Sequence, residues 1–310
     1  MKRIACVALL VATAACSAAP EAPKEEAASA PAPAPEPAAP AGLQPVWTAT
    51  EGIATPESVY VDPASGFIFT SQVDGMPGER DGKGHIAKLN ADGTVAVANW
   101  VDGLNAPKGL RSYQGTLWTA DLDEVVGIDI ATAKITTRVK IAGAQFLNDV
   151  ATGADGTVYV SDMMGNKIFA VKGGKATVFA EGEQLEYPNG LLVEGDKLVV
   201  GGWGKPEADF STKVPGRIFT LDLKTKAKTL ITPEPFGNTD GLESDGKGGY
   251  VVSNYLTGAI LRVSATGQST QIGQFKPGAA DIALTPAGVL MVPHMNENAI
   301  GAYNIASALQ

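Results

Sequence analysis

Six segments of this sequence share a pattern, and the second residue of each could take part in chemistry. These residues are Glu57, Lys108, Asn148, Asn189, Asp240 and Asp281. Glutamate, asparagine and aspartate side chains offer hard oxygen atoms, which are the ligands that Ca²⁺ prefers. Carboxylates that are crowded together away from water also need a compensating positive charge. The pattern therefore predicts one Ca²⁺ ion at the point where these oxygen-bearing side chains converge.

These residues belong to a repeated unit of strands. Each segment gives a short strand, a glycine-containing turn and an apolar strand, as in "PESVYVDPASGFIFTS", "PKGLRSYQGTLWTA", "LNDVATGADGTVYVSD", "PNGLLVEGDKLVVGG", "TDGLESDGKGGYVVSN" and "ADIALTPAGVLMVPH". The second residues of successive segments are 51, 40, 41, 51 and 41 positions apart. A third and a fourth strand follow in each of the first five units. About forty residues with four strands are typical of a β-propeller blade. The sequence therefore predicts an all-β, six-bladed propeller with four strands per blade.

The two ends of the repeat indicate how the ring closes. The sixth unit lacks a fourth strand, while an unassigned strand, "LQPVWTAT", precedes the first unit. Pairing this N-terminal strand into the last blade would remove two open sheet edges. We therefore expect one propeller domain over residues 43–310.

The propeller places the repeated residues at one end of its central channel. The innermost strand of each blade lines the channel, so the residue that begins it lies at the channel mouth. The chain returns to the same face at the end of each second strand, with Gln72, Asp121, Asp162, Trp203, Asn254 and His294. Two insertions, at 73–84 and 204–216, fall on this face and are candidate lids.

The first 42 residues predict export and anchoring. A basic start and an apolar run of 12 residues, from Ile4 to Ala15, are typical of a signal peptide over residues 1–15. "TAAC" resembles a bacterial lipobox that would lipidate Cys16, although an ordinary signal-peptidase site is the alternative. The Ala/Pro-rich stretch that completes 16–42 predicts a disordered tether. We therefore expect a protein of the bacterial cell envelope that contacts the membrane only through its lipid, or a secreted protein if Cys16 carries none.

Composition excludes several functions. The net charge of −9 becomes about −11 without Lys2 and Arg3, which argues against nucleic-acid binding. Both cysteines, Cys6 and Cys16, lie before residue 43, so the propeller has no thiolate nucleophile and no zinc–cysteine site. We expect a monomer.

The repeated residues at the channel mouth, which form a ring around the propeller axis, also carry a resemblance to a known family. The chain resembles, over 43–310, the calcium-dependent six-bladed propeller hydrolases of the senescence-marker-protein and gluconolactonase family, with diisopropyl fluorophosphatase and the paraoxonases as relatives. The resemblance assigns the metal to Glu57 in "TPESV", Asn148 in "FLNDV", Asn189 in "YPNGL" and Asp240 in "NTDGL". It implies a lactonase, esterase or phosphotriesterase in which the ion acts as a Lewis acid. Asp240 would be the nucleophile or the base, and His294 in "VPHMNENAI" resembles a histidine near the metal.

Three residues depart from the family's pattern or could contact a substrate. Phe146 stands where gluconolactonase-like members carry an arginine that holds a sugar acid, so a more apolar lactone or ester is expected. Lys108 puts a cation in the ring: it could form a salt bridge with Glu57, anchor an anionic substrate group, or replace the metal. Trp203 could wall a substrate pocket or belong to the core between blades. The alternative function is a non-enzymatic propeller that binds a ligand or protein on this face.

Overall fold

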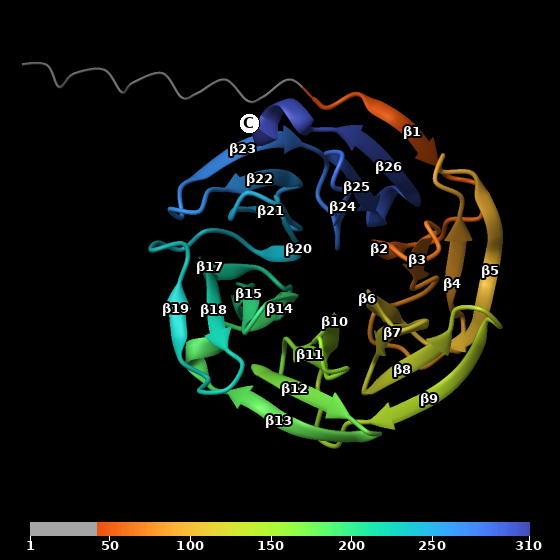
Figure 1. Ribbon diagram of the computed structural model, residues 1–310, viewed down its shortest axis with the longest axis horizontal. Coiled ribbons are helices and arrows are strands. Elements are labelled where there is room, and N and C mark those ends of the chain that lie inside the picture. Colours follow the sequence, from red (N-terminus) through yellow and green to blue (C-terminus); the bar gives the residue numbers. More distant parts are fainter. Residues whose placement is uncertain (1–41) are drawn as a thin grey trace, which may run out of the picture. The chain divides into compact units, whose positions relative to one another are not determined.

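The structure is a computed structural model that describes residues 42–310 (Figure 1). The expected signal peptide, Cys16 and nearly all of the expected tether therefore lie outside the described residues. Within 42–310, β-strands form six four-stranded antiparallel sheets around a central channel, which confirms the predicted propeller.

The first three blades each use four consecutive strands, ordered from the channel outward. Blade one contains β2 (Pro56–Val61), β3 (Ile68–Gln72), β4 (Gly84–Leu89) and β5 (Val95–Leu104). Blade two contains β6 (Pro107–Tyr113), β7 (Thr116–Asp121), β8 (Glu124–Asp129) and β9 (Lys134–Lys140). Blade three contains β10 (Leu147–Thr152), β11 (Val158–Asp162), β12 (Lys167–Lys172) and β13 (Lys175–Glu181).

The remaining blades follow the same order with one interruption and one exchange. Blade four contains β14 (Pro188–Glu194), β15 (Lys197–Gly202), β18 (Ile218–Asp222) and β19 (Lys228–Leu230), and a small hairpin of β16 (Gly204–Pro206) and β17 (Thr212–Pro215) interrupts it. Blade five contains β20 (Thr239–Ser244), β21 (Tyr250–Asn254), β22 (Ala259–Val263) and β23 (Ser269–Gln274). Blade six contains β24 (Ala283–Leu284), β25 (Val289–His294), β26 (Ala299–Asn304) and, outermost, β1 (Pro45–Ala49).

The pairing of β1 confirms the predicted closure of the ring. Trp47 lies opposite Ala302 and Ala49 lies opposite Ile300, so an N-terminal strand completes the C-terminal blade. The innermost segments of blades six and one also pair directly, because Asp281 donates its backbone N–H to Glu57 O at 2.9 Å. The only helices among the described residues are three short 3₁₀ turns, η1 (Glu183–Leu185), η2 (Met295–Glu297) and η3 (Ala306–Leu309). Across residues 42–310 we find no helix with the length and apolarity needed to cross a membrane.

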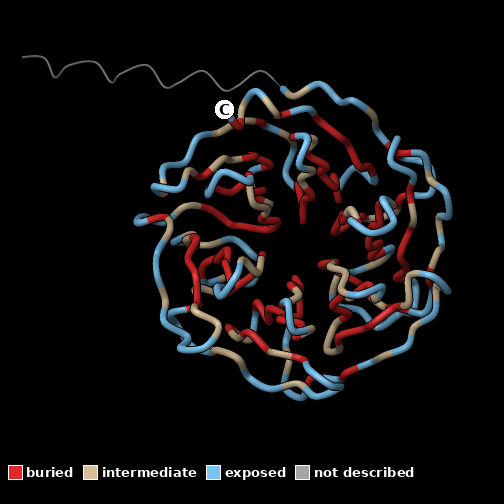
Figure 2. The backbone as a smooth tube through the Cα atoms, in the orientation of Figure 1, coloured by how far each residue is buried: buried red, intermediate tan, exposed pale blue. Residues whose placement is uncertain are grey.

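The core is distributed between the blades. Six buried apolar clusters lie one at each junction of neighbouring blades, for example Val199, Ile218 and Leu242 between blades four and five. Figure 2 shows buried chain toward the inner strands and exposed chain around the rim. Burial of apolar faces between sheets fixes each blade relative to the next.

A β-bulge in each of five blades changes the direction of the strand next to the channel-mouth residue. In blades one to five the register of the innermost pair shifts between the start of the inner strand and two or three residues later, at Pro56/Ser58, Pro107/Leu110, Leu147/Val150, Pro188/Leu191 and Thr239/Leu242. Bulges bend a strand locally and are over-represented next to functional sites. Glycine follows the ring residue where inner strands approach closely: a Cβ at Gly109 would lie 2.2 Å from Asp149 Oδ1, and one at Gly241 would lie 2.3 Å from Ile282 N.

Candidate functional site at the mouth of the channel

The bulged ends of the inner strands surround a cavity of about 220 Å³. All six blades contribute to its wall. The lining residues are Glu57, Pro77, Lys108, Phe146, Asn148, Met163, Asn189, Trp203, Asp209, Phe210, Asp240, Tyr255, Leu256 and Met295. The structure thus brings together the four predicted metal ligands and the three predicted substrate-binding residues.

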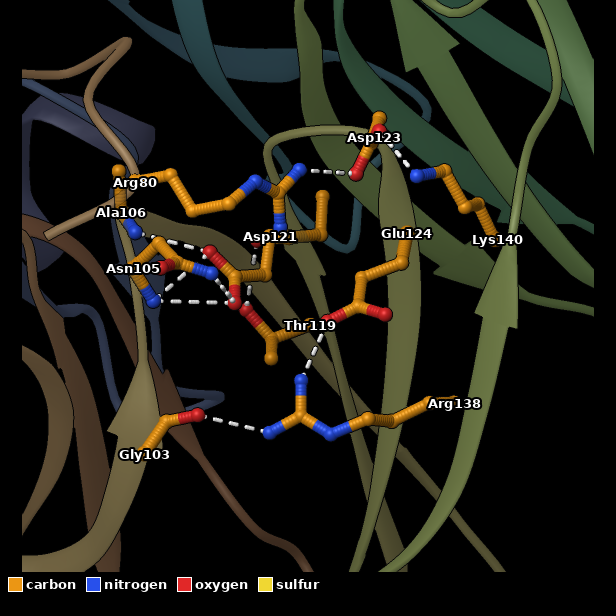
Figure 3. Close-up of polar contacts among 11 residues, drawn as sticks. Arg80, Gly103, Asn105, Ala106, Thr119, Asp121, Asp123, Glu124, Arg138 and Lys140 are labelled. Atoms are coloured by element: carbon orange, nitrogen blue, oxygen red, sulfur yellow. Dashed lines mark hydrogen bonds and ion pairs between the residues drawn. The ribbon is translucent and has the colours of Figure 1, made fainter. Parts of the chain in front are cut away.

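Polar residues at the ends of the second strands hold the loops that lead into this cavity. Asp121 accepts the backbone N–H groups of Asn105 and Ala106 just before Lys108 in the sequence, as Figure 3 shows. Asp162 accepts the N–H groups of Gln145 and Phe146 in the equivalent place of blade three. Carboxylates bound by backbone N–H groups are strong, charge-assisted acceptors. These aspartates therefore position the loops that lead to the channel-mouth residues Lys108 and Asn148, and they have little capacity left for a ligand.

The blade-one insertion is tied to the neighbouring blade. Arg80 pairs with Asp123 at 2.6 Å, and Lys140 pairs with the other oxygen of Asp123 at 3.3 Å (Figure 3). Arg138 in turn pairs with Glu124 and donates to Gly103 O at 2.7 Å. Exposed pairs contribute little stability singly, but here they connect the insertion that carries Pro77 to blade two.

Two oxygen atoms of the predicted metal ligands receive no hydrogen bond from the described part of the protein. Glu57 Oε2 and Asn189 Oδ1 are buried and have no hydrogen-bond partner within the described residues. Asn189 donates its Nδ2–H to Asp240 Oδ1 at 3.3 Å, which leaves its own oxygen free. Buried polar atoms without partners are costly and rare in folded proteins. A cation bound between these side chains would satisfy them.

Electrostatics favour the same conclusion. Burial and the neighbouring charge of Asp240 raise the pKa of Glu57 well above its ordinary value. Burial and the charge of Asp281 likewise raise the pKa of Asp240 well above its ordinary value. Two desolvated carboxylates are held here without sufficient positive charge, and a divalent cation would reverse both effects.

Lys108 does not supply that charge by direct contact. Its ammonium, on a side chain only 2% exposed, donates to Pro77 O and Ala106 O, each at 3.0 Å, and lies 4.7 Å from the Phe146 ring centre. No ion pair joins it to Glu57 among residues 42–310, so the salt bridge considered from the sequence is not formed. Burial lowers the pKa of Lys108, and the charge of Glu57 acts against that effect.

The residues present fit a calcium ion better than a transition metal. No group of three or more histidine, cysteine, aspartate or glutamate side chains suited to a metal occurs in the part of the chain that the structure describes, so a metal here would also need carboxamide oxygens. The cavity instead combines two carboxylates, Glu57 and Asp240, with two carboxamides, Asn148 and Asn189. Such an all-oxygen set suits Ca²⁺, with water and substrate needed to complete its shell.

The structure separates His294 and Asp281 from the cavity wall. His294 Nε2 lies 2.8 Å from the Tyr303 hydroxyl, and its ring packs edge-on against Phe275 at 4.8 Å. Its pKa is lowered by burial. Asp281 Oδ2 accepts the Ser58 hydroxyl at 2.5 Å. Neither residue is among those that line the cavity in the described chain.

Further along the inner strands the channel is crossed by an internal ion pair. Arg111, three residues after Lys108, binds Glu243, three residues after Asp240, at 2.8 Å. Asp149 accepts the N–H of Leu191 at 2.6 Å, and burial raises its pKa to about 7. Partners are incomplete here too, because Arg111 Nε and Asp281 Oδ1 have none within the described residues. These groups are not among the residues that line the cavity.

Sequence reasoning missed several apolar residues of the cavity wall. Met163, Tyr255 and Met295 each come one residue after the end of a second strand. Trp203 does so too, because β15 ends at Gly202 and not, as the sequence predicted, at Trp203. The equivalent positions in blades one and two are Val73 and Leu122, also apolar, so the repeat itself carried a signal that could have found them. Asp209 and Phe210 lie in the insertion at 204–216, which the sequence identified as a candidate lid without indicating which of its residues would line the cavity.

Comparisons with known proteins agree on the fold. No protein-family model matches the sequence, and no curated protein does. Among solved structures, a gluconolactonase from Xanthomonas campestris matches with 18% identity and a TM-score of 0.62, covering 82% of this chain and 87% of that one. A catalytically inactive virginiamycin B lyase from Staphylococcus aureus, solved with quinupristin, matches with 14% identity and a TM-score of 0.58, covering 84% and 98%. A chain from a nidogen/laminin complex matches with 13% identity and a TM-score of 0.60, covering 73% and 88%. At these identities the matches show a shared fold alone.

Proposed function

We propose that the channel mouth binds one Ca²⁺ ion and that the protein hydrolyses a lactone, ester or phosphoester there. The observation that carries the proposal is the pair of buried, unpartnered oxygen atoms, Glu57 Oε2 and Asn189 Oδ1, in the wall of one cavity that also contains Asn148 and Asp240. The likeness in fold to a gluconolactonase adds support, since that enzyme belongs to the class proposed here.

Each residue has a distinct part in the proposed reaction. When bound, the ion would polarise the carbonyl or phosphoryl oxygen of the substrate and stabilise the charge that develops on it. The Asn189 amide holds Asp240 through Oδ1. Asp240 would then act as the nucleophile or as the base that activates water. His294 contacts Tyr303 instead of lining the cavity, so we give it no direct part.

Lys108 would contribute to substrate binding. An ammonium has three N–H donors, and the carbonyl oxygens of Pro77 and Ala106 accept two of them. The remaining N–H can donate to an anionic or carbonyl oxygen of a substrate in the cavity that Lys108 lines. The lysine would thus orient a substrate without touching the ligands of the ion.

The test is a calcium titration of the purified protein by calorimetry, followed by a panel of lactones, aryl esters and phosphotriesters assayed with and without chelator. We expect calcium binding tighter than the millimolar range and hydrolysis that stops when calcium is removed. Absence of binding in wild type would leave the ring as a polar channel mouth.

Lys108 also favours the second candidate, a propeller that binds a ligand or protein on this face without catalysis. A cation in the ring reduces the attraction of the site for a metal, because its positive charge acts at Glu57 and Asp240 and repels a second cation. Binding without calcium and without turnover of any substrate in the panel would support this candidate.

We further propose that the protein is exported and tethered to the bacterial envelope through lipid on Cys16, which lies outside the described residues. Cys16→Ser should prevent processing at the lipobox and release the protein from the membrane fraction. A wild-type mature N-terminus beyond Cys16 would contradict this proposal.

A further inference from the structure

The blade-four insertion forms an ordered hairpin at the cavity. β16 and β17 are joined by residues 207–211, where Glu207 donates its N–H to Ser211 O at 2.8 Å. Asp209 accepts both the N–H and the hydroxyl of Ser211, at 3.1 and 2.6 Å. The turn is therefore held by its own hydrogen bonds, and its residues Asp209 and Phe210 line the cavity.

Phe210 is held in an unfavourable backbone conformation. Its φ is 63°, in the left-handed region, which is an outlier for a bulky residue. Such strain persists only where surrounding contacts enforce it, and it is common at binding sites. Here the indole N–H of Trp203 donates to Phe210 O at 3.0 Å, and Phe210 donates its own N–H to Glu207 O at 3.0 Å. These bonds hold the backbone of Phe210 in place.

The ring of Phe210 is apolar surface that no protein group covers fully. The residue is 40% exposed, and its ring centre lies 5.9 Å from that of Phe146 at an angle of 54°. Phe146 is in turn held by Asp162, which accepts its N–H at 2.7 Å. Two fixed aromatic rings at the edge of a cavity offer favourable contacts to a third aromatic group, and burial of exposed apolar surface by such a group is favourable.

One side chain connects this hairpin to the candidate metal ligands. Asn238 Nδ2 donates to Trp203 O at 2.8 Å and to Thr212 Oγ1 at 2.9 Å. Asn238 lies two residues before Asp240, so the strand that carries Asp240 and the hairpin that carries Phe210 share an anchor.

We infer that Phe146 and Phe210 bind an aromatic group of the substrate and that Phe210 determines specificity for it. The substrate class is then an ester or lactone that carries an aromatic substituent. This assignment of substrate rests on the proposed function, whereas binding of the aromatic group depends only on the hairpin and Phe146.

The test separates binding from hydrolysis. Binding of N-benzylacetamide and of N-methylacetamide, two amides that differ in the aromatic ring, is measured by calorimetry on the full-length protein in chelator. We expect the benzyl probe to bind wild type at least about tenfold more tightly. Phe210→Ala should remove most of that difference, and so should Phe210→Gly, which also suits the left-handed backbone. Phe210→Leu should retain part of it.

Leu230→Ala is the matched control, because Leu230 is 42% exposed on the outermost strand of the same blade. It should leave both probes unchanged. Equal binding of the two probes by wild type, or an unchanged benzyl affinity in Phe210→Ala and Phe210→Gly, would overturn the inference. The ratio of kcat/KM for phenyl acetate over ethyl acetate should fall in the same variants. If no ester is hydrolysed but benzyl binding depends on Phe210, the proposed function fails and the aromatic site stands.

Discussion

Asp162 and Asp240 are both buried aspartates on one face of the propeller, at 0% and 5% exposure, yet their surroundings differ. Asp162 ends β11 and accepts the backbone N–H groups of Gln145, Phe146 and Gly165. Asp240, near the start of β20, accepts one carboxamide N–H, from Asn189, among the described residues. Residue type and burial are therefore poor guides to role. The number of hydrogen bonds that a carboxylate already accepts indicates whether it positions a loop or is available to a ligand.

The largest effect is expected from Asp240→Asn. The substitution keeps the shape but removes a charge of the ion site and the proposed nucleophile or base, so hydrolysis should fall by about 10³-fold or more. Folding should survive, because burial raises the pKa of Asp240 and a neutral amide avoids the cost of a buried charge. Steady-state kinetics and thermal melting by circular dichroism measure the two results. An active Asp240→Asn variant would remove Asp240 from the mechanism.

Calcium should stabilise the folded protein by binding the channel-mouth oxygen atoms that lack hydrogen-bond partners. A ligand that binds only the native state adds roughly 2.7 kcal/mol at a hundredfold excess over Kd. The melting temperature should therefore rise with calcium and fall with chelator in wild type, and the shift should shrink in Asp240→Asn. Magnesium serves as the control ion, because its strict octahedral geometry suits this four-sided oxygen set less well. Equal shifts in both proteins would contradict the assignment of ligands.

Asp162→Ala, unlike Asp240→Asn, should lower the stability of the folded protein. It leaves buried backbone N–H groups without an acceptor, so we expect a loss of about 1–3 kcal/mol in the free energy of unfolding. Asp162→Asn, which keeps one acceptor oxygen, should lose less. Urea denaturation measures both. If Asp162→Ala were as stable as wild type, the distinction between loop-holding and ligand-binding carboxylates would fail.

The smallest effect is expected from Lys108→Met. This change removes a positive charge from the surroundings of the ion, so calcium affinity should stay equal or increase by up to about tenfold. Substrate binding should weaken, because the N–H proposed to hold a substrate oxygen is lost. Calorimetry of calcium binding and KM values give the two readouts. A fall in calcium affinity would show that Lys108 supports the ion site.

Much of this arrangement could be predicted because residues at the same position of a sequence repeat occupy the same place in each blade. Once six similar segments are aligned, residues such as Glu57 and Asn189 occupy the same place in different blades, and the symmetry of the ring brings them to one mouth. The closing role of the N-terminal strand follows from a blade that is one strand short. The residues after the second strands, such as Met163 and Tyr255, could have been found in the same way.

The sequence alone thus determined the six blades, their closure and the identity of the channel-mouth residues, since these depend on periodic patterns of local chemistry. Only the tertiary structure decided how each side chain is satisfied. It directs Lys108 to the carbonyl oxygens of Pro77 and Ala106, and it pairs His294 with Tyr303. It also sets Phe210, from the blade-four insertion, beside Phe146. Which hydrogen bonds form depends on the distances between side chains of different blades and insertions. A single sequence does not give those distances.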